Sequence, residues 1–294
     1  MSTMNWIVAS SLMFSFSVAM YLLVRKLQHQ QIDNDIVTYA LGAMPVVFLG
    51  LGALITKTNL SVLPRQLLWL AFMGIVFSYL GNKLSLLGIK SAPNPGYSLV
   101  IQKSYAPYSA LMAAFIFGDS LPTVKLIAIL FIVTSIARLL IDDNSQTKES
   151  KSITWALQSF GSFFLFGTLV LASRQLLLEG LDPIAIAFYI FLWAAVMFTI
   201  ELLRRSKGKK FNKISKSVLT QLLIIGLLNA LFNFTMQSAF ATAPNVGYVN
   251  VINASSIAGI TLLSPIFFKE DSLSIGKLLS VLGIILGLSL LFIA

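Results

Sequence analysis

The sequence contains no cysteine and only one histidine, and only 11% of its 294 residues are charged. Without cysteine, disulfides, thiol catalysis and thiolate metal sites are excluded. The single histidine, His29, lies beside Arg25, Lys26 and Gln28, so we expect a solvated loop residue and not a metal ligand. The sequence therefore predicts no cofactor, and it offers little of the acid/base or nucleophilic equipment that an enzyme needs.

Apolar side chains are abundant in the sequence. The hydrophobic fraction is 57% and the mean hydropathy is +0.85, which is too apolar for a soluble domain with a polar surface. Uncharged runs of about 20 residues, the length that crosses roughly 30 Å of hydrocarbon as a helix, recur along the chain. The alternating pattern of a transmembrane barrel is not seen. We predict an all-α polytopic membrane protein with ten transmembrane helices, at residues 5–24, 36–55, 66–89, 96–117, 121–141, 153–177, 183–203, 218–241, 246–268 and 274–293.

The two halves of the sequence resemble each other. The hexamer Ala-Pro-Asn-Pro-Gly-Tyr at residues 92–97 recurs as Ala-Pro-Asn-Val-Gly-Tyr at residues 243–248, an offset of 151 residues. Collinear matches accompany it, including Asn82 with Asn233, Asp119 with Asp271, and Arg25 with Arg174. We therefore predict two five-helix repeats, residues 1–145 and 146–294.

An odd number of spans in each repeat makes the second enter the membrane from the opposite side. Inverted repeats of this kind are typical of secondary transporters, whose substrate site lies near the bilayer midplane between the halves. The alternative is that duplication merely built a larger bundle.

The net charge of +10 does not indicate nucleic-acid binding, because the cations lie mainly in the predicted loops. Fifteen lysines and arginines fall in odd-numbered loops and four in even-numbered loops. Since such residues favour cytoplasmic loops, the count predicts termini outside the cytoplasm. The expected partners are the lipid bilayer and a small-molecule substrate, in a membrane that we take to be a prokaryotic plasma membrane. No oligomeric state follows from the sequence, and a monomer suffices.

The tandem layout resembles the EamA-like branch of the drug/metabolite transporter superfamily. The resemblance rests on the Ala-Pro-Asn-x-Gly-Tyr start of helices four and nine and on the tail of the second repeat, which carries Pro265, Glu270, Asp271, Gly283 and Gly287. The first repeat departs from the pattern, with Pro107 earlier in its helix and Asp119 in place of the usual glutamate. The resemblance implies ten helices, export or exchange of metabolites, and a central cavity lined chiefly by helices one, three, four, six, eight and nine. It also implies cytoplasmic termini, opposite to the cation count.

Two lysines, Lys83 and Lys103, lie within predicted spans, where ionisable groups normally face a bundle interior or a water-filled cavity. Each is about seven residues, roughly 10 Å, from the turn between helices three and four, on the same side of the membrane. Two interpretations are open: both lysines converge on one anionic group, or each extends its flexible side chain to the membrane interface. No carboxylate lies at the membrane centre, Glu201 being the deepest, so export of cationic drugs through a membrane-centre glutamate is not expected.

Neutral hydrogen-bonding groups complete the candidate substrate site. Asn229, Asn233 and Gln237 form one stripe at i, i+4 and i+8, which either lines a cavity or bonds a neighbouring helix. The predicted substrate-binding residues are Lys103, Lys83, Asn82, Gln102, Tyr97, Asn229, Asn233, Gln237, Tyr248, Asn250 and Asn253.

We expect a secondary transporter of a small polar or anionic metabolite, such as an amino acid or organic acid, that works by alternating access. The alternative within transport is a phosphorylated solute, such as a sugar phosphate, nucleotide sugar or lipid-linked head group, for which two converging lysines would suit the phosphate. A non-transporting membrane scaffold is the alternative from another class, and it would not need lysines inside its spans.

Overall fold

The computed structural model describes residues 5–92, 95–141, 153–206, 215–268 and 273–293. Every regular element within these ranges is a helix, which confirms the all-α fold class. In chain order they are α1 (Trp6–His29), α2 (Asn34–Gly42), α3 (Pro45–Ile55), α4 (Pro64–Phe72), the π-helix η1 (Met73–Leu80), α5 (Gly81–Ser91), α6 (Pro95–Lys103), α7 (Tyr105–Phe117), α8 (Thr123–Ile141), α9 (Thr154–Leu178), α10 (Pro183–Ser206), α11 (Lys216–Thr242), α12 (Val246–Phe267) and α13 (Ile275–Ile293).

Nine helices or runs of consecutive helices in the described ranges are long and apolar enough to cross a membrane. The predicted fourth span, residues 96–117, is missing from that count because a turn at Ser104 divides it into α6 and α7. The two pieces together cover the predicted segment, so the ten predicted segments are all helical. The chain is an integral, multi-pass membrane protein.

Three of the predicted spans are interrupted, and proline accounts for two of the interruptions. Pro45 stands at the start of α3, where it separates that helix from α2. Pro107 has no N–H to give to the carbonyl of Lys103, and its ring clashes with that carbonyl, so the helix breaks at Ser104. In the third span the break is a change of helix type, because η1 is a π-helix between α4 and α5.

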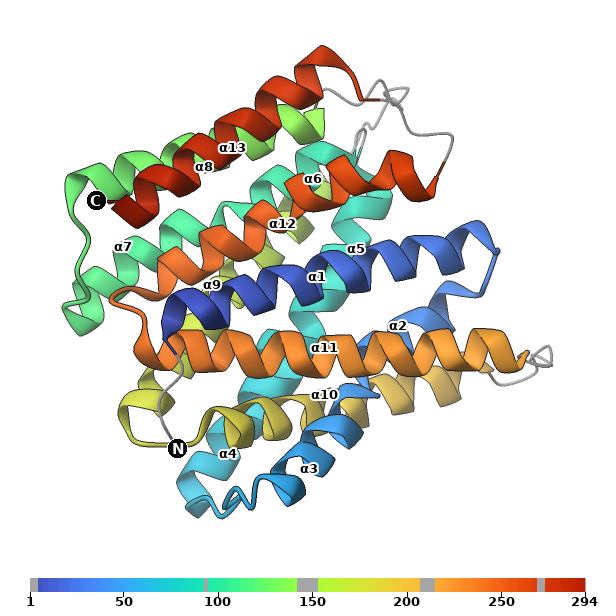
Figure 1. The fold of residues 1–294 in the computed structure, drawn as a ribbon. Helices are drawn as coiled ribbons and strands as arrows, with labels where there is room; N and C mark the ends of the chain where they lie inside the picture. Colours follow the sequence, from blue (N-terminus) through green and yellow to red (C-terminus); the bar gives the residue numbers. More distant parts are fainter. Residues whose placement is uncertain (1–4, 93–94, 142–152, 207–214, 269–272, 294) are drawn as a thin grey trace.

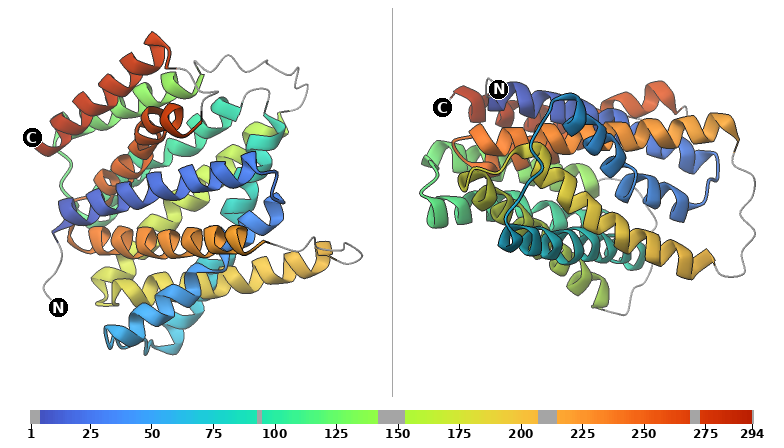
Figure 2. Two further views of the ribbon diagram at one scale, coloured as in Figure 1. Left: turned by 45° about the vertical axis from the view of Figure 1, so that its right-hand side comes forward. Right: turned by 90° about the horizontal axis from the view of Figure 1, so that it is seen from below.

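The helices run back and forth between two ends of the bundle (Figure 1). We define the cation-rich end as the one at which α1, α5, α8, α10 and α12 finish. The described cations at this end include Arg25, Lys26, Lys90, Arg138, Arg204 and Lys216. The start of α1 and the finish of α13 both lie at the opposite end, as the further views in Figure 2 also show.

Helices at corresponding places in the two halves of the chain make corresponding contacts. Helix α1 packs against α11 and α12, and its repeat equivalent α9 packs in the same way against α5 and against α6 and α7. Equivalent helices also pack on each other across the centre, α8 on α13, α7 on α12, and α3 on α10. The predicted boundary between residues 145 and 146 lies outside the described residues.

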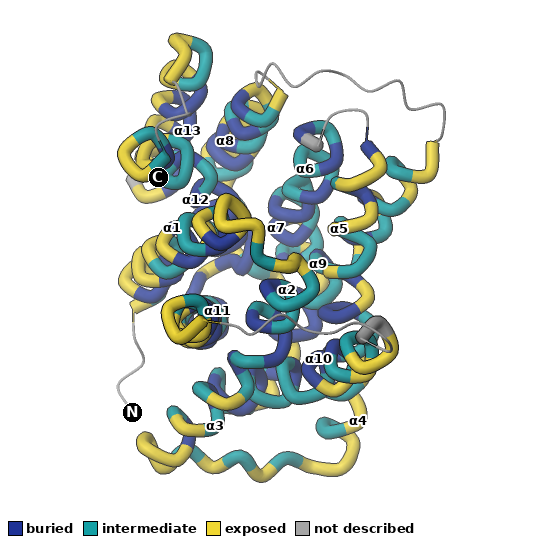
Figure 3. Tube along the Cα trace, turned by 90° about the vertical axis from the view of Figure 1, so that its right-hand side faces the viewer, coloured by how far each residue is buried: buried dark blue, intermediate teal, exposed yellow. Residues whose placement is uncertain are grey.

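Close helix crossings explain several residues of the repeated pattern. A Cβ on Gly247 would lie 2.2 Å from Cβ of Ala110, so glycine is what lets α12 approach α7. A Cβ on Gly287 would lie 2.4 Å from Ile132, which holds α13 tightly on α8. The exposed residues lie on the outer faces of helices such as α11 and α13, and they include many large apolar side chains, as expected where lipid is the solvent (Figure 3).

Candidate functional site

Lys103 is the last residue of α6 and lies in the interior of the fourth span, eight residues from its start at Pro95. That spacing corresponds to a depth of about 12 Å at 1.5 Å per residue. The side chain is half-buried, and among the described residues it makes no hydrogen bond and no ion pair. A cation at this depth without a counter-charge is costly unless something neutralises it.

Groups from three helices surround the break beside Lys103. Two residues beyond it, the hydroxyl of Tyr105 accepts a hydrogen bond from Nδ2 of Asn253 in α12, at 3.1 Å. The hydroxyl of Tyr21 in α1 lies within electrostatic range of Tyr105. Tyr21 is 45% exposed although it lies inside a span, and Asn253 is half-buried. Two phenols and an amide are therefore gathered where α1, α7 and α12 meet, and Lys103 ends α6 on the other side of the break.

Asn82 and Asn233 are repeat equivalents with similar surroundings. Asn82 is exposed and donates only to the carbonyl of Ser78 in its own helix, at 2.7 Å. Asn233 is half-buried and donates to Asn229, one turn earlier, at 2.9 Å. The amide oxygen of neither side chain accepts a hydrogen bond from any described residue. Both can still accept one from a ligand.

Three predicted site residues are instead buried between helices. Gln102 is 5% exposed and bonds Ser85 of α5 and Ser98 of its own helix, at 2.7 and 2.9 Å. Asn250 is fully buried and donates to the hydroxyl of Ser109 at 2.7 Å, although its amide oxygen has no hydrogen-bond partner. Tyr248 is fully buried as well. These contacts hold α6 on α5 and α12 on α7, and they leave little room for a ligand.

Both ends of the predicted polar stripe on α11 bond neighbouring helices. Asn229 donates to the carbonyl of Leu41 in α2 at 2.6 Å, and Gln237 donates to Ser173 in α9 at 3.3 Å. Of the two alternatives left open by the sequence, helix-to-helix bonding therefore describes Asn229 and Gln237. The amide oxygen of Gln237 is buried without a hydrogen-bond partner. Tyr97, at the start of α6, is half-buried and makes no hydrogen bond with the described residues.

Lys83 has a counter-charge that the sequence did not predict. Its Nζ lies 3.4 Å from Oε1 of Glu201 in α10, and the hydroxyl of Tyr79 donates to Oε2 of the same carboxylate at 2.8 Å. The Lys83 ammonium also lies 5.7 Å from the centre of the Tyr79 ring. Lys103, by contrast, belongs to α6, which packs on α5, α7, α8 and α9. No described contact joins the two lysines, and the charge of Lys83 is already balanced.

A polar network at the opposite end of the bundle was missed by the sequence reasoning. Arg174 of α9 forms an ion pair with Asp119 at 3.0 Å and donates to the carbonyl of Phe240 in α11 at 2.6 Å. Both charged side chains are buried, with 10% and 6% exposed. The signal was available, because Arg174 and Asp119 each belong to a matched pair in the repeat, with Arg25 and Asp271. The equivalent Asp271 and the neighbouring Glu270 lie outside the described residues.

The repeated hexamer contributes to the same end. Asn245 caps α12 by accepting from the N–H of Gly247 at 2.8 Å, and its Nδ2 donates to the carbonyl of Ala110 at 3.1 Å. The Tyr248 hydroxyl donates to the carbonyl of Ser120 at 2.5 Å, and the Ser120 N–H donates to the carbonyl of Pro244 at 3.2 Å. The motif thus ties the start of the ninth span to the end of the fourth.

The described residues contain no group of three His, Cys, Asp or Glu side chains that could hold a metal ion. The ring of His29 stacks on Phe268, with centroids 4.9 Å apart. The ring of Trp6, the first residue of α1, lies between those of Tyr248 and Phe292, with centroid distances of 6.2 and 5.8 Å.

Comparison with known proteins shows a shared fold and a family similarity over the second half of the chain. A solved crystal structure superposes with a TM-score of 0.80 over 97% of this chain and 98% of that chain, at 13% sequence identity, which shows a shared fold. No curated protein matches the chain. Residues 153–293 match the EamA-like transporter family. This match confirms the resemblance of the chain to the EamA-like branch of the drug/metabolite transporter superfamily, a family of membrane transporters of small molecules.

Proposed function

We propose that the chain is a secondary transporter that carries a small polar or anionic metabolite, such as an amino acid or organic acid, by alternating access around Lys103. The observation that carries the proposal is a lysine about 12 Å along a membrane span that has no counter-ion among the described residues. A substrate carboxylate would supply the missing charge, and a charge-assisted hydrogen bond of this kind contributes about 1.5–3 kcal/mol.

The neighbouring groups suit the rest of such a substrate. Tyr105, Asn253 and Tyr21 offer hydroxyl and amide groups on the other side of the helix break that follows the lysine, and Asn82 and Asn233 each keep an amide oxygen available to a donor such as an ammonium or hydroxyl. We place Gln102, Asn250 and Tyr248 in the supporting framework because their polar groups already bond neighbouring helices or loops.

The pairing of Lys83 with Glu201 supports this substrate class over a phosphorylated solute. A phosphate carries more charge than a carboxylate and was expected to need both lysines. Glu201 balances Lys83 in the described arrangement, so one free cation remains.

Alternating access is supported by the contrast between the two ends of the bundle. We propose that the buried Arg174–Asp119 pair closes the opposite end in this conformation and must separate when that end opens. We further propose that residues 1–145 and 146–294 are the moving repeats. The cation count supports a cytoplasmic cation-rich end, in a prokaryotic plasma membrane, with both termini outside the cytoplasm.

The test is a metabolite screen by thermal shift on purified protein, followed by transport in proteoliposomes for each compound that binds. An anionic solute is expected to raise the melting temperature of the wild type, because it binds only the folded state, and Lys103→Ala should lose both the shift and the transport. Lys90→Ala is the matched control, since Lys90 is an exposed lysine at the end of α5.

Transport that survives Lys103→Ala would overturn the role of this lysine. Competition by phosphorylated solutes, but not by their unphosphorylated counterparts, would instead support the phosphate alternative. The absence of transport for every stabilising compound would favour a scaffold.

A further inference from the structure

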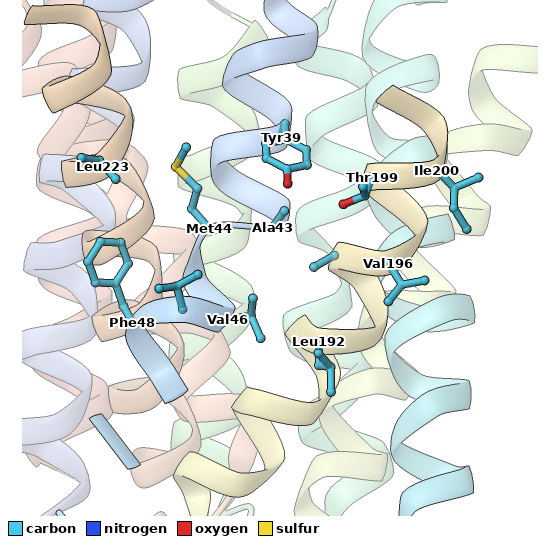
Figure 4. Close-up of a pocket in the computed structure, with 12 residues that line it drawn as sticks. Tyr39, Ala43, Met44, Val46, Phe48, Leu192, Val196, Thr199, Ile200 and Leu223 are labelled. Atoms are coloured by element: carbon cyan, nitrogen blue, oxygen red, sulfur yellow. The ribbon is translucent and has the colours of Figure 1, made fainter. Parts of the chain in front are cut away.

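A recess on the side of the bundle lies between α2 and α3 on one side and α10 and α11 on the other (Figure 4). Its volume is about 620 Å³, within the roughly 300–1,000 Å³ that ligand sites occupy. Ten of the twelve side chains that line it are apolar, and the two exceptions are Tyr39 and Thr199. The recess is separate from Lys103, which does not line it.

The recess opens toward the hydrocarbon of the bilayer. Val47 on α3 is 58% exposed and continues a fully apolar exposed stripe with Leu51, Leu54 and Ile55. On α10, Val196 and Ile200 are exposed, and on α11 so is Leu223. Three apolar, exposed helix faces therefore meet at the recess, as they do where a helical bundle contacts lipid.

The polar groups lie toward one end of the recess. Figure 4 shows Tyr39 and Thr199 near each other, with their hydroxyls directed into the space, while Phe48 and Leu192 lie farther along. Neither hydroxyl makes a hydrogen bond with the described residues. Beyond Thr199, one turn past Ile200, comes Arg204, an exposed residue near the cation-rich end of α10.

Arg204 belongs to a neighbouring small pocket of about 220 Å³ that shares Ile200 with the recess and also contains Lys83 and Glu201. Those two charges are paired with each other. Arg204 makes no hydrogen bond or ion pair with the described residues, so the small pocket keeps one unbalanced positive charge.

We propose that the recess and Arg204 together bind one anionic glycerophospholipid from the leaflet at the cation-rich end. Its phosphate lies beside Arg204, its ester carbonyls accept from Tyr39 and Thr199, and one acyl chain fills the recess. The dimensions fit, because Leu192 lies twelve residues before Arg204, about 18 Å along the helix, against about 15 Å for half of the hydrocarbon core. The single net charge matches one phosphodiester.

The proposal gives the lipid a position between the repeats. Helices α2 and α3 belong to the first repeat, whereas α10 and α11 belong to the second. A lipid held there contacts both, so its binding is expected to respond to movement of one repeat against the other.

The experiment uses native mass spectrometry of delipidated protein in detergent, titrated with phosphatidylglycerol or with phosphatidylcholine of the same acyl chains. One phosphatidylglycerol is expected to bind about fivefold more tightly than phosphatidylcholine, as one arginine near the surface allows. Arg204→Gln should abolish that preference. Lys216→Gln, which removes an exposed cation at the same end of the molecule, should keep it.

Two further arms separate the lipid from other occupants. Val196→Phe, which narrows the recess, should weaken both lipids. If that variant folds poorly, Thr199→Val tests the same site differently, because it keeps the volume but removes the hydroxyl offered to an ester carbonyl, and it should weaken both lipids to a smaller extent. Glycerol 3-phosphate, which has the phosphate but no acyl chain, should not displace bound lipid. Equal binding of the two lipids in the wild type, or displacement by glycerol 3-phosphate, would overturn the proposal.

Discussion

The fourth and ninth spans begin with nearly the same hexamer and occupy equivalent places in the two repeats, yet they differ in the middle. The ninth is one continuous helix, α12, whereas the fourth breaks at Ser104 into α6 and α7. At the offset of 151 residues, Ala254 and Ala258 stand where the fourth span has Lys103 and Pro107. Both alanines are buried. If the two halves are repeats, as proposed, the site around Lys103 is a departure from their symmetry.

The largest expected effect comes from breaking the ion pair that ties the end of the fourth span to α9, the sixth span. Arg174→Met leaves the Asp119 carboxylate buried without its partner, so we expect a loss of about 3–5 kcal/mol in the free energy of unfolding. The double variant Arg174→Met/Asp119→Leu should recover most of that loss, because no charge is then stranded. Chemical unfolding in detergent measures both, and a double variant as unstable as the single one would contradict this reading.

A smaller effect is expected from exchanging the helix break between the two spans. Ala258→Pro should destabilise α12 by about 3 kcal/mol or more, since it removes a helical hydrogen bond and introduces a clash. Pro107→Ala should have the opposite effect and raise the melting temperature, because α6 and α7 can then join. Transport by Pro107→Ala should fall, because joining α6 and α7 reorients the Lys103 side chain. Full transport by this variant would mean that the break has no part in the site.

The smallest effect is expected from removing the single hydrogen bond that joins Tyr105 of the fourth span to Asn253 of the ninth. Tyr105→Phe removes the hydroxyl that accepts from Asn253, and we expect the apparent substrate affinity to fall about 2–10-fold, the range for one neutral hydrogen bond. Tyr108→Phe is the matched control, because the Tyr108 hydroxyl makes no hydrogen bond with the described residues. Equal losses in the two variants would show that ring packing, and not the hydroxyl, matters at position 105.

The spans were predictable from the sequence because hydrophobic length alone decides which segments cross a bilayer. The breaks at Pro45 and Pro107 had a visible cause, although the predicted spans ran through both. The π-helix η1 had none, since its residues are as apolar as those of an ordinary span. Hydropathy shows where a span lies and does not show the path of the backbone within it.

The candidate site was less predictable from the sequence. An amide side chain in a span needs hydrogen-bond partners, and either a neighbouring helix or a ligand can supply them. Gln102 and Asn253 are repeat equivalents, yet Gln102 is enclosed by serines while Asn253 meets a tyrosine beside the break. The Lys83–Glu201 pair joins residues more than a hundred positions apart, and nothing in either span's local sequence indicates the other. Only the arrangement of the helices separates the paired lysine from the unpaired one.

The lone charge of Lys103 has an electrical consequence under the proposed function. When a monoanion is bound, the lysine and the substrate together are neutral, and the loaded protein changes conformation without moving net charge at the site. After release, the returning protein carries one fixed positive charge through part of the membrane field, which is worth up to about 2.3 kcal/mol per 100 mV. The membrane voltage would then set the rate of the empty return and not that of the loaded step.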